Sequence, residues 1–402
     1  MQEPSIPRRS LFNASAQAGL IGTLTALGLL GAVAPAHARP TDYKALVCLY
    51  LFGGNDGNNL IVPLDPDRYD RYAAIRGASG LALSPQARTL LPQRRAMLRA
   101  TAAPVEQPFA FHYGVPELDA LYERGQVAAV LNVGSLRQPL TKAQYLAGTA
   151  IPAQLFSHPD QSMQHDGATP GPAGAVHTQP ARRIRARAPH GAGGEPLPQG
   201  GAHDGMELVT DLHMPSCMSP LSTLFPGYSL AAQLNTVAQL IRARACAGPG
   251  RQVYFVSLSG FDTHGAQASQ QFNMLRQVSQ SLGAFQQALS EIGAQDCVTT
   301  FTMSEFGRTL QPNSGGTDHA WGNHQLVVGA AVKGGVYGRF PDFTLGGADD
   351  ATGRGAWIPQ FSNQQFGATL GNWFGVKTDL RNKLGLKNES LHFDTMDLGF
   401  MG

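Results

Sequence analysis

Three short apolar segments, far apart in the chain, each lead directly into a cluster of acidic, amide or histidine side chains. They run over Leu46–Phe52, Val253–Leu258 and Val298–Met303. A nearly continuous apolar run that is bounded by turn residues is typical of a strand buried on both faces of a parallel sheet. The pattern therefore predicts an α/β protein with a mostly parallel, doubly wound sheet.

The polar residues that follow these segments predict a binding site. Asp56 follows the first segment, Asp262 and His264 follow the second, and Glu305 follows the third. In open α/β sheets ligands bind beyond the carboxyl ends of the strands, so we expect these side chains to meet at one edge. Carboxylate and imidazole ligands together suit a divalent metal ion. Zinc is one candidate, and manganese or iron is the other.

The spacing of Asp262 and His264 favours binding of one metal ion by both side chains, because side chains two residues apart lie on the same side of an extended segment. The alternative is a capping aspartate beside an ordinary loop histidine. A later glycine-rich loop carries Asp318 and His319, which we expect to add ligands. For His324, five residues further on, the alternatives are a further ligand and a loop residue that faces solvent, and we expect the latter.

The loop after the first segment, Gly53–Asn59, is rich in glycine and asparagine. It is not a phosphate-binding P-loop, because it lacks the Gly-Lys-Ser/Thr ending. Glycine and asparagine allow the backbone to turn sharply, which would bring Asp56 to the sheet edge as a metal carboxylate. The alternative is that Asp56 caps a helix or stabilises a turn.

Composition excludes some functions. The 402 residues are 43% hydrophobic, which is ample for a core, and the formal net charge of +2 gives no electrostatic case for nucleic acid binding. None of the four cysteines has metal-site spacing, and we expect Cys48 and Cys297 to be buried thiols.

The N-terminal residues 1–38 have the pattern of an export signal. Arg8 and Arg9 precede a long uncharged apolar stretch, and Ala36-His37-Ala38 supplies a cleavage site with small residues. The paired arginines favour the twin-arginine translocase as partner, so we expect a periplasmic or extracellular protein. The alternative is an uncleaved membrane anchor. No second apolar stretch is long enough to span a bilayer, so we expect no membrane span after cleavage.

The remainder, residues 39–402, is predicted to form one domain. Amphipathic spacing predicts helices, and further apolar runs predict strands. The predicted helices are Tyr69–Arg76, Pro116–Arg124, Leu230–Ile241, Gln271–Ile292 and Gln364–Phe374, and the additional strands are Val127–Val133 and Leu326–Val332.

An irregular segment at about 160–220 interrupts this pattern. From Ser157 to Leu224 the chain contains no Phe, Tyr or Trp but is rich in Pro, Gly, Ala, His and Arg. Such a composition buries too little apolar surface to offset the cost of ordering, so we expect disorder. Two further hypotheses are a histidine tract that buffers metal and a segment translated out of frame.

Four strings in the sequence carry a resemblance to a known family. They are LFGGNDGNN, VSLSGFDTHGAQ, TMSEFGRT and GTDHAWGNHQLVVG. They resemble a bacterial family, usually exported by the twin-arginine route, that is catalogued as domain of unknown function 1501. That family is similar to the alkaline-phosphatase-like superfamily, which includes sulfatases and cofactor-independent phosphoglycerate mutases.

The resemblance implies a three-layer α/β/α sandwich of the alkaline-phosphatase-like type. It implies that Asp56 is the first metal carboxylate, that Asp262 and His264 bind one ion and that His319 is the late histidine ligand. Glu305 stands where the superfamily has an aspartate followed by a histidine. In this sequence Phe306 replaces that histidine. The resemblance therefore leaves open whether the site holds one metal ion or two.

The superfamily also implies a nucleophile near the metal. Ser157 and Ser135 are the candidates, because each follows the predicted strand at Val127, and the string from Ser157 to Gln161 resembles a Ser-His pair followed by Asp-Gln in relatives. The alternative for either serine is an ordinary surface residue. Arg308 would clamp the anionic substrate through its planar guanidinium.

The sequence therefore predicts an exported metal-dependent hydrolase that acts on phosphate or sulfate esters, small anionic molecules. The alternative is a non-catalytic binding or assembly protein of the cell envelope that retains a degenerate site. A third hypothesis, a nonfunctional product of a damaged gene, depends on the reading frame of the irregular segment.

Overall fold

The computed structural model describes residues 42–83, 94–97, 106–149, 151–152, 155–158, 161, 220–247, 250–376 and 393–402. The described helices and strands belong to one compact unit, made of Met1–Pro170 and Leu221–Gly402. The predicted signal at 1–38 and nearly all of the predicted irregular segment at about 160–220 lie outside the described residues. Among the described residues, no helix is long and apolar enough to cross a membrane.

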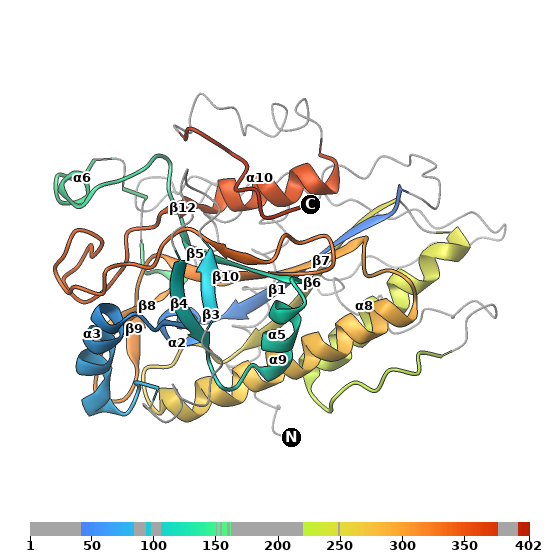
Figure 1. Cartoon of the computed structure of the whole chain (residues 1–402), viewed down its shortest axis with the longest axis horizontal. Coiled ribbons are helices and arrows are strands. Elements are labelled where there is room, and N and C mark those ends of the chain that lie inside the picture. The colour runs from blue at the N-terminus through green and yellow to red at the C-terminus, as the bar shows by residue number, and fades with distance from the viewer. Residues whose placement is uncertain are drawn as a thin grey trace, which may run out of the picture. The chain divides into compact units, whose positions relative to one another are not determined.

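A mixed, mostly parallel sheet of seven strands forms the centre of the unit (Figure 1). Six strands lie in the order β11-β5-β10-β7-β1-β6, and β12 also pairs with β5. Their bounds are β1 Lys44–Phe52, β5 Val127–Gly134, β6 Arg251–Ser259, β7 Val298–Met303, β10 Asn323–Val328, β11 Gly335–Tyr337 and β12 Phe361–Ser362. The α/β class is confirmed. The three strands that precede polar clusters are neighbours, since β1 pairs in parallel with both β6 and β7.

Two details of the sheet differ from the prediction. Strand β10 runs antiparallel to both of its neighbours, β5 and β7, although it is buried along its whole length. A central strand is covered on both faces whichever way it runs, so its apolar pattern does not reveal its direction. Strand β6 lies at the end of the sheet and is only partly buried.

Helices cover both faces of the sheet (Figure 1). Helices α5 (Pro116–Glu123), α8 (Ser229–Ala247) and α9 (Gln267–Glu291) share a core with Val47 and Leu49 of β1. Helix α10 (Asn363–Phe374) shares the opposite core with the alternate β1 residues, among them Cys48. This alternation follows from the period of two along a strand. Cys48 is buried as expected, whereas Cys297 is half-buried.

Smaller elements lie beside the sheet, and the apolar pattern did not predict most of them. They are α2 Gly57–Leu60, β2 Ile61–Pro63, α3 Pro66–Arg76, η2 Gly77–Ser79, β3 Arg94–Met97, β4 Glu106–Phe111, α6 Lys142–Leu146, β8 Arg308–Pro312 and β9 Thr317–His319. A three-stranded sheet has the order β2-β4-β3, and β8 pairs with β9 as an antiparallel hairpin. That hairpin follows β7 and carries His319 toward the end of the central sheet.

The register of the sheet brings the ends of β1 and β6 together. Phe52 pairs with Ser259, so the loops that follow these strands leave the sheet at the same level. Gly53 has a φ of +114°, and a Cβ atom there would lie 2.2 Å from the backbone nitrogen of Asp262. Glycine is therefore required where the two loops touch.

Candidate metal centre

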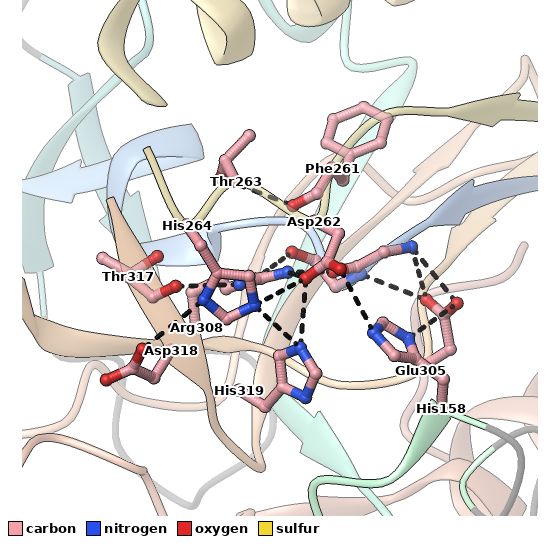
Figure 2. Close-up of polar contacts among 12 residues, drawn as sticks. His158, Phe261, Asp262, Thr263, His264, Glu305, Arg308, Thr317, Asp318 and His319 are labelled. Carbon is pink, nitrogen blue, oxygen red and sulfur yellow. Dashed lines mark hydrogen bonds and ion pairs between the residues drawn. The ribbon is translucent and has the colours of Figure 1, made fainter. Parts of the chain in front are cut away.

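Three residues from different parts of the chain form a group that could hold a metal ion. They are His158, Asp262 and His319, and one candidate ligand atom from each lies within 4.8 Å of the others. Asp262 follows β6, His319 ends β9, and His158 belongs to the segment 155–158. Figure 2 shows the three side chains turned toward one another.

The carboxylate of Asp262 is at the centre of this group. Its Oδ1 lies 3.0 Å from Nε2 of His319 and 3.0 Å from Nε2 of His264, and these two nitrogens are 3.2 Å apart. Its Oδ2 lies 3.7 Å from Nε2 of His158. Three imidazoles therefore surround one carboxylate, and the predicted meeting of Asp262, His264 and His319 is observed (Figure 2).

The tautomer of His319 follows from its other nitrogen. Its Nδ1 lies 2.8 Å from the carbonyl oxygen of Phe156. A carbonyl oxygen can only accept, so Nδ1 carries the proton and Nε2 of the neutral ring presents a lone pair to Asp262. Burial lowers the pKa of His319 and favours this neutral form. Two acceptors thus face each other, which is the arrangement expected around a cation.

Asp262 is ionised at neutral pH. Partial burial acts to raise the pKa of its carboxyl, but the hydrogen bond and the positive charge of Arg308 act in the opposite direction, and the pKa is lowered below its ordinary value. The half-exposed carboxylate is therefore a charged ligand that needs no proton release before it binds a cation.

Arg308 positions Asp262 and does not face a substrate. Its guanidinium donates to Asp262 and to the carbonyl oxygens of Gly53, Gly54 and Thr317, and its exposed fraction is 1%. This placement gives no support to the expectation that Arg308 clamps an anion, because the guanidinium is buried and each of its nitrogens donates within the protein.

Glu305 lies next to the group but binds mainly to backbone. Its carboxylate accepts hydrogen bonds from the amides of Gly53 and Gly54 at 3.0–3.1 Å. Nδ1 of His158 lies 3.4 Å from Glu305 Oε1. Glu305 thus fixes the loop after β1 and contacts the one imidazole that faces Oδ2 of Asp262.

Asp56 is not brought into the group. Its carboxylate pairs with the fully buried guanidinium of Arg76 at 2.6 Å and accepts from the side chain of Gln267. It also accepts from the amide of Asn58 at 3.1 Å as the N-cap of α2. The expectation of a metal carboxylate is therefore corrected to the alternative, a capping residue in a buried ion pair.

Asp318 and His324 also differ from expectation. Asp318 Oδ2 pairs with Arg354, and its Oδ1 lies 3.5 Å from Nδ1 of His264, so it orients a ligand more than it acts as one. His324 does not face solvent. It is 2% exposed, and its Nδ1 accepts from the amide of Asn132 at 3.0 Å.

The two candidate nucleophiles are placed differently. Ser135 is buried, and its hydroxyl donates to Gln161 at 2.9 Å. Ser157 is partly exposed and directly precedes His158 in the chain. Of the two, Ser157 is the one joined directly to a member of the metal group.

His158 is the member of this candidate group that sequence reasoning did not predict as a ligand. The string Ser157–Gln161 was its only signal, because the segment around it has no strand or helix periodicity. Phe156, whose carbonyl orients His319, has a φ of +77°, a left-handed conformation uncommon for a residue with a side chain.

Comparison with known families gives one match, which covers residues 222–355. The matching family is described as "Protein of unknown function (DUF1501)". This range includes Asp262, His264 and His319 but not His158. No curated protein matches the chain.

Two solved structures show a partial likeness. The one described as "Crystal structure of Ps i-CgsB in complex with k-i-k-neocarrahexaose" is 12% identical, over 41% of this chain and 39% of that chain, with a TM-score of 0.27. "Crystal structure of Ps i-CgsB" is 13% identical, over 34% and 37%, with a TM-score of 0.23. The chain thus spans about two fifths of the length of these structures. The comparisons establish that the part of the chain with most of the centre's residues matches a family of unknown function.

Proposed function

We propose that this protein is a metal-dependent hydrolase that cleaves phosphate or sulfate esters. One observation carries the proposal: an ionised carboxylate, Asp262, lies 3.0 Å from the lone-pair nitrogen of a neutral His319. His264 and His158 approach the same carboxylate from two further directions. Two imidazoles and a carboxylate are a common ligand set for zinc, iron and manganese.

The spacing of the ligand atoms bears on the ion. With bonds of ~2.1 Å, ligand atoms are ~3.4 Å apart at a tetrahedral ion and ~3.0 Å apart on one face of an octahedral ion. The atoms of Asp262, His264 and His319 are 3.0–3.2 Å apart. These separations lie between the two ideal values, so the ligand set suits zinc, manganese or iron.

Each residue then has a role in hydrolysis. A divalent ion in such a site polarises a phosphoryl or sulfuryl oxygen and lowers the pKa of bound water. Arg308 and Phe156 hold Asp262 and His319 in place through the hydrogen bonds described above. Ser157, which is next to His158, is the proposed nucleophile.

A second candidate function is a non-catalytic binding or assembly protein of the cell envelope with the same metal centre. One observation favours it: Arg308, the residue expected to hold an anionic substrate, has its nitrogens engaged with the protein's own carbonyl and carboxylate oxygens. We also propose export through the twin-arginine route, because residues 1–38 have the signal pattern.

The test is metal quantification by mass spectrometry on the full chain, combined with aryl phosphate and aryl sulfate assays. We expect close to one ion per chain and hydrolysis of one ester class. Asp262→Asn and His319→Asn should each lower metal occupancy at least tenfold. Asp70→Asn, which changes an exposed carboxylate on α3, is the matched control.

The outcomes separate the candidates. Metal-loaded protein that hydrolyses neither ester supports the binding protein. Wild-type metal content in both Asp262→Asn and His319→Asn would refute the metal centre itself.

A further inference from the structure

Strand β6 forms one end of the central sheet, and most of its outer edge is open. It pairs with β1 on one side, and no described strand pairs with it on the other. The strand at the opposite end of the sheet, β11, has only three residues, whereas β6 has nine. A long open edge presents a row of main-chain N–H and C=O groups to which another strand can add.

Alternate residues of β6 face this outer edge. The carbonyl oxygen of Gly250, just before the strand, accepts from the amide of Lys44 in β1 at 2.9 Å, so the even-numbered residues face β1. The odd-numbered residues face outward, because successive residues of a strand direct their N–H and C=O groups to opposite sides. Ser257 agrees with this parity, since its amide and its carbonyl both bond to the side chain of Gln233 from α8, each at 3.0 Å.

The contact with Gln233 shows what the edge can bind. One amide group donates to the carbonyl oxygen of Ser257 and accepts from its N–H, as a residue of an added strand would. The other outward residues within the strand's paired length are Arg251, Val253 and Phe255, and their main-chain groups have no such partner among the described residues. The free part of the edge is therefore centred on Val253.

The free part of the edge is uncharged and partly apolar. Residues Gln252–Val256 include no charged side chain, no proline and no lysine, which are the devices that commonly protect an edge strand. Val253 and Phe255 are half-buried and pack at the margin of the core beneath α10. Arg251, at the start of the strand, is paired with Asp42 at 2.8 Å.

We propose that this edge pairs with the same edge of a second copy of the chain, in an antiparallel ladder centred on Val253. With a two-fold axis at this residue, Val253 faces Val253 of the other copy and Arg251 faces Phe255. Each free N–H and C=O group then gains a partner. Ser257, which Gln233 already occupies, lies outside this register.

A second copy fits this edge better than an unrelated extended peptide. The free residues are symmetric about Val253, and the register places the two Arg251 side chains at opposite ends of the ladder, so that identical charges do not meet. Pairing also brings Val253 and Phe255 of both copies together on one face of a continuous sheet, which buries apolar surface. The inference does not depend on the proposed function, because none of these residues belongs to the metal centre.

The first test is sedimentation velocity of the full chain over a wide range of concentration. We expect a dimer, and Val253→Pro should weaken it at least tenfold because proline removes the central N–H. The fold tolerates this change, since that N–H makes no bond to β1. Val253→Lys, which sets two like charges opposite each other, serves if the proline variant fails to fold. Val253→Thr keeps both the N–H and the branched side chain, so it is the matched control and should dimerise as the wild type does.

The second test is cross-linking, which reports the register. Val253→Cys places two thiols opposite each other with Cα atoms about 5.5 Å apart, a separation that a disulfide can span. Mild oxidation should therefore give more covalent dimer than in the wild type. Phe255→Cys is the matched control and should give no such increase, because its two positions are about 13 Å apart along the ladder.

Three outcomes would overturn the proposal. The first is a wild type that stays monomeric at every concentration. The second is a dimer of unchanged strength in both Val253→Pro and Val253→Lys, since association would then use another surface. The third is cross-linking of Phe255→Cys without cross-linking of Val253→Cys, which would contradict the register. Metal content, measured on the same samples, should be unchanged in every variant, which separates this proposal from the metal centre.

Discussion

Asp56 and Asp262 are both carboxylates that follow parallel strands, yet their surroundings give them different tasks. The side chain of Asp56 is 1% exposed and pairs with an arginine that is fully buried, whereas that of Asp262 is 49% exposed and faces imidazoles. A buried pair neutralises both charges within the protein, while a half-exposed carboxylate beside lone-pair nitrogens retains charge to offer a cation. Exposure and partner together, more than position after a strand, distinguish the structural carboxylate of Asp56 from the candidate ligand Asp262.

We predict that Asp56→Ala lowers the free energy of unfolding by about 3–5 kcal/mol, because it leaves the Arg76 guanidinium buried without a counter-charge. Urea denaturation measures this loss. Asp65→Ala is the control: Asp65 caps α3 and is only half-buried, so its removal should cost about 1 kcal/mol. Equal small losses in both variants, with metal lost in Asp56→Ala, would restore Asp56 as a ligand.

A second prediction at this scale concerns pH. Burial lowers the pKa of His324 from 6.5 to about 4. Between these values the unfolded chain binds a proton that the folded protein does not, so the free energy of unfolding falls as the pH falls from 6.5 to 4. At roughly 1.4 kcal/mol per pKa unit, this loss is roughly 3 kcal/mol.

In His324→Gln the unfolded chain no longer takes up a proton at residue 324. The free energy of unfolding of this variant should therefore change less steeply with pH than that of the wild type. Urea titrations from pH 4 to 7.5, all with chelator to remove effects of metal, provide the measurement. Burial also lowers the pKa of His112 to about 4, so His112→Gln should flatten the curve in the same way. Parallel curves for wild type and His324→Gln would contradict the prediction.

The sequence predicts the position of a site residue when that residue directly follows a strand or helix with a clear sequence pattern. Asp262 and His264 come directly after β6, so strand topology alone brings them to the sheet edge. His158 lies in a segment without such periodicity, and only tertiary contacts place it beside Glu305 and Asp262. The engagement of Arg308 with backbone carbonyls was likewise invisible, because a sequence does not show which carbonyls surround a guanidinium.

Among the elements, β1 and β7 were predicted well because strands covered on both faces leave uninterrupted apolar runs. The hairpin β8–β9 was not predicted, because β9 has only three residues and shows no strand pattern in the sequence. Yet this hairpin carries Asp318 and His319. The loop of the hairpin and the loop after β6 meet where Gly316 approaches Thr263, and this contact holds the two halves of the metal centre together.

We predict that Gly316→Ala lowers metal occupancy severalfold, because the new Cβ would lie 2.2 Å from the carbonyl oxygen of Thr263 and push the two loops apart. Gly265→Ala is a close control, since a Cβ at Gly265 meets no atom within 4 Å. Metal quantification on both variants makes the comparison. Equal occupancies would show that the contact does not set the geometry of the centre.

At the scale of the whole molecule, the metal centre joins segments that are distant in the chain. His158 precedes the irregular segment, whereas Asp262 and His319 follow it. An ion bound by all three closes a long loop of chain and binds the folded state alone. Such an ion stabilises the folded protein by about 2.7 kcal/mol when its free concentration is a hundred times its Kd.

Chelation should therefore lower the unfolding temperature of the whole protein, and added manganese or zinc should restore it. The variants separate this effect from general stability. Asp262→Asn and His319→Asn should unfold at the same temperature with and without chelator, because each removes a ligand. Gly265→Ala should respond as the wild type does.

The variant His158→Asn tests whether the ion also binds the part of the chain before the irregular segment. If its response to chelator equals that of the wild type, the ion is held only by residues after the irregular segment, and the site does not couple the two parts of the chain. A lost or reduced response would show that the ion stabilises the connection across that segment, which is what the position of His158 beside Asp262 and Glu305 leads us to expect.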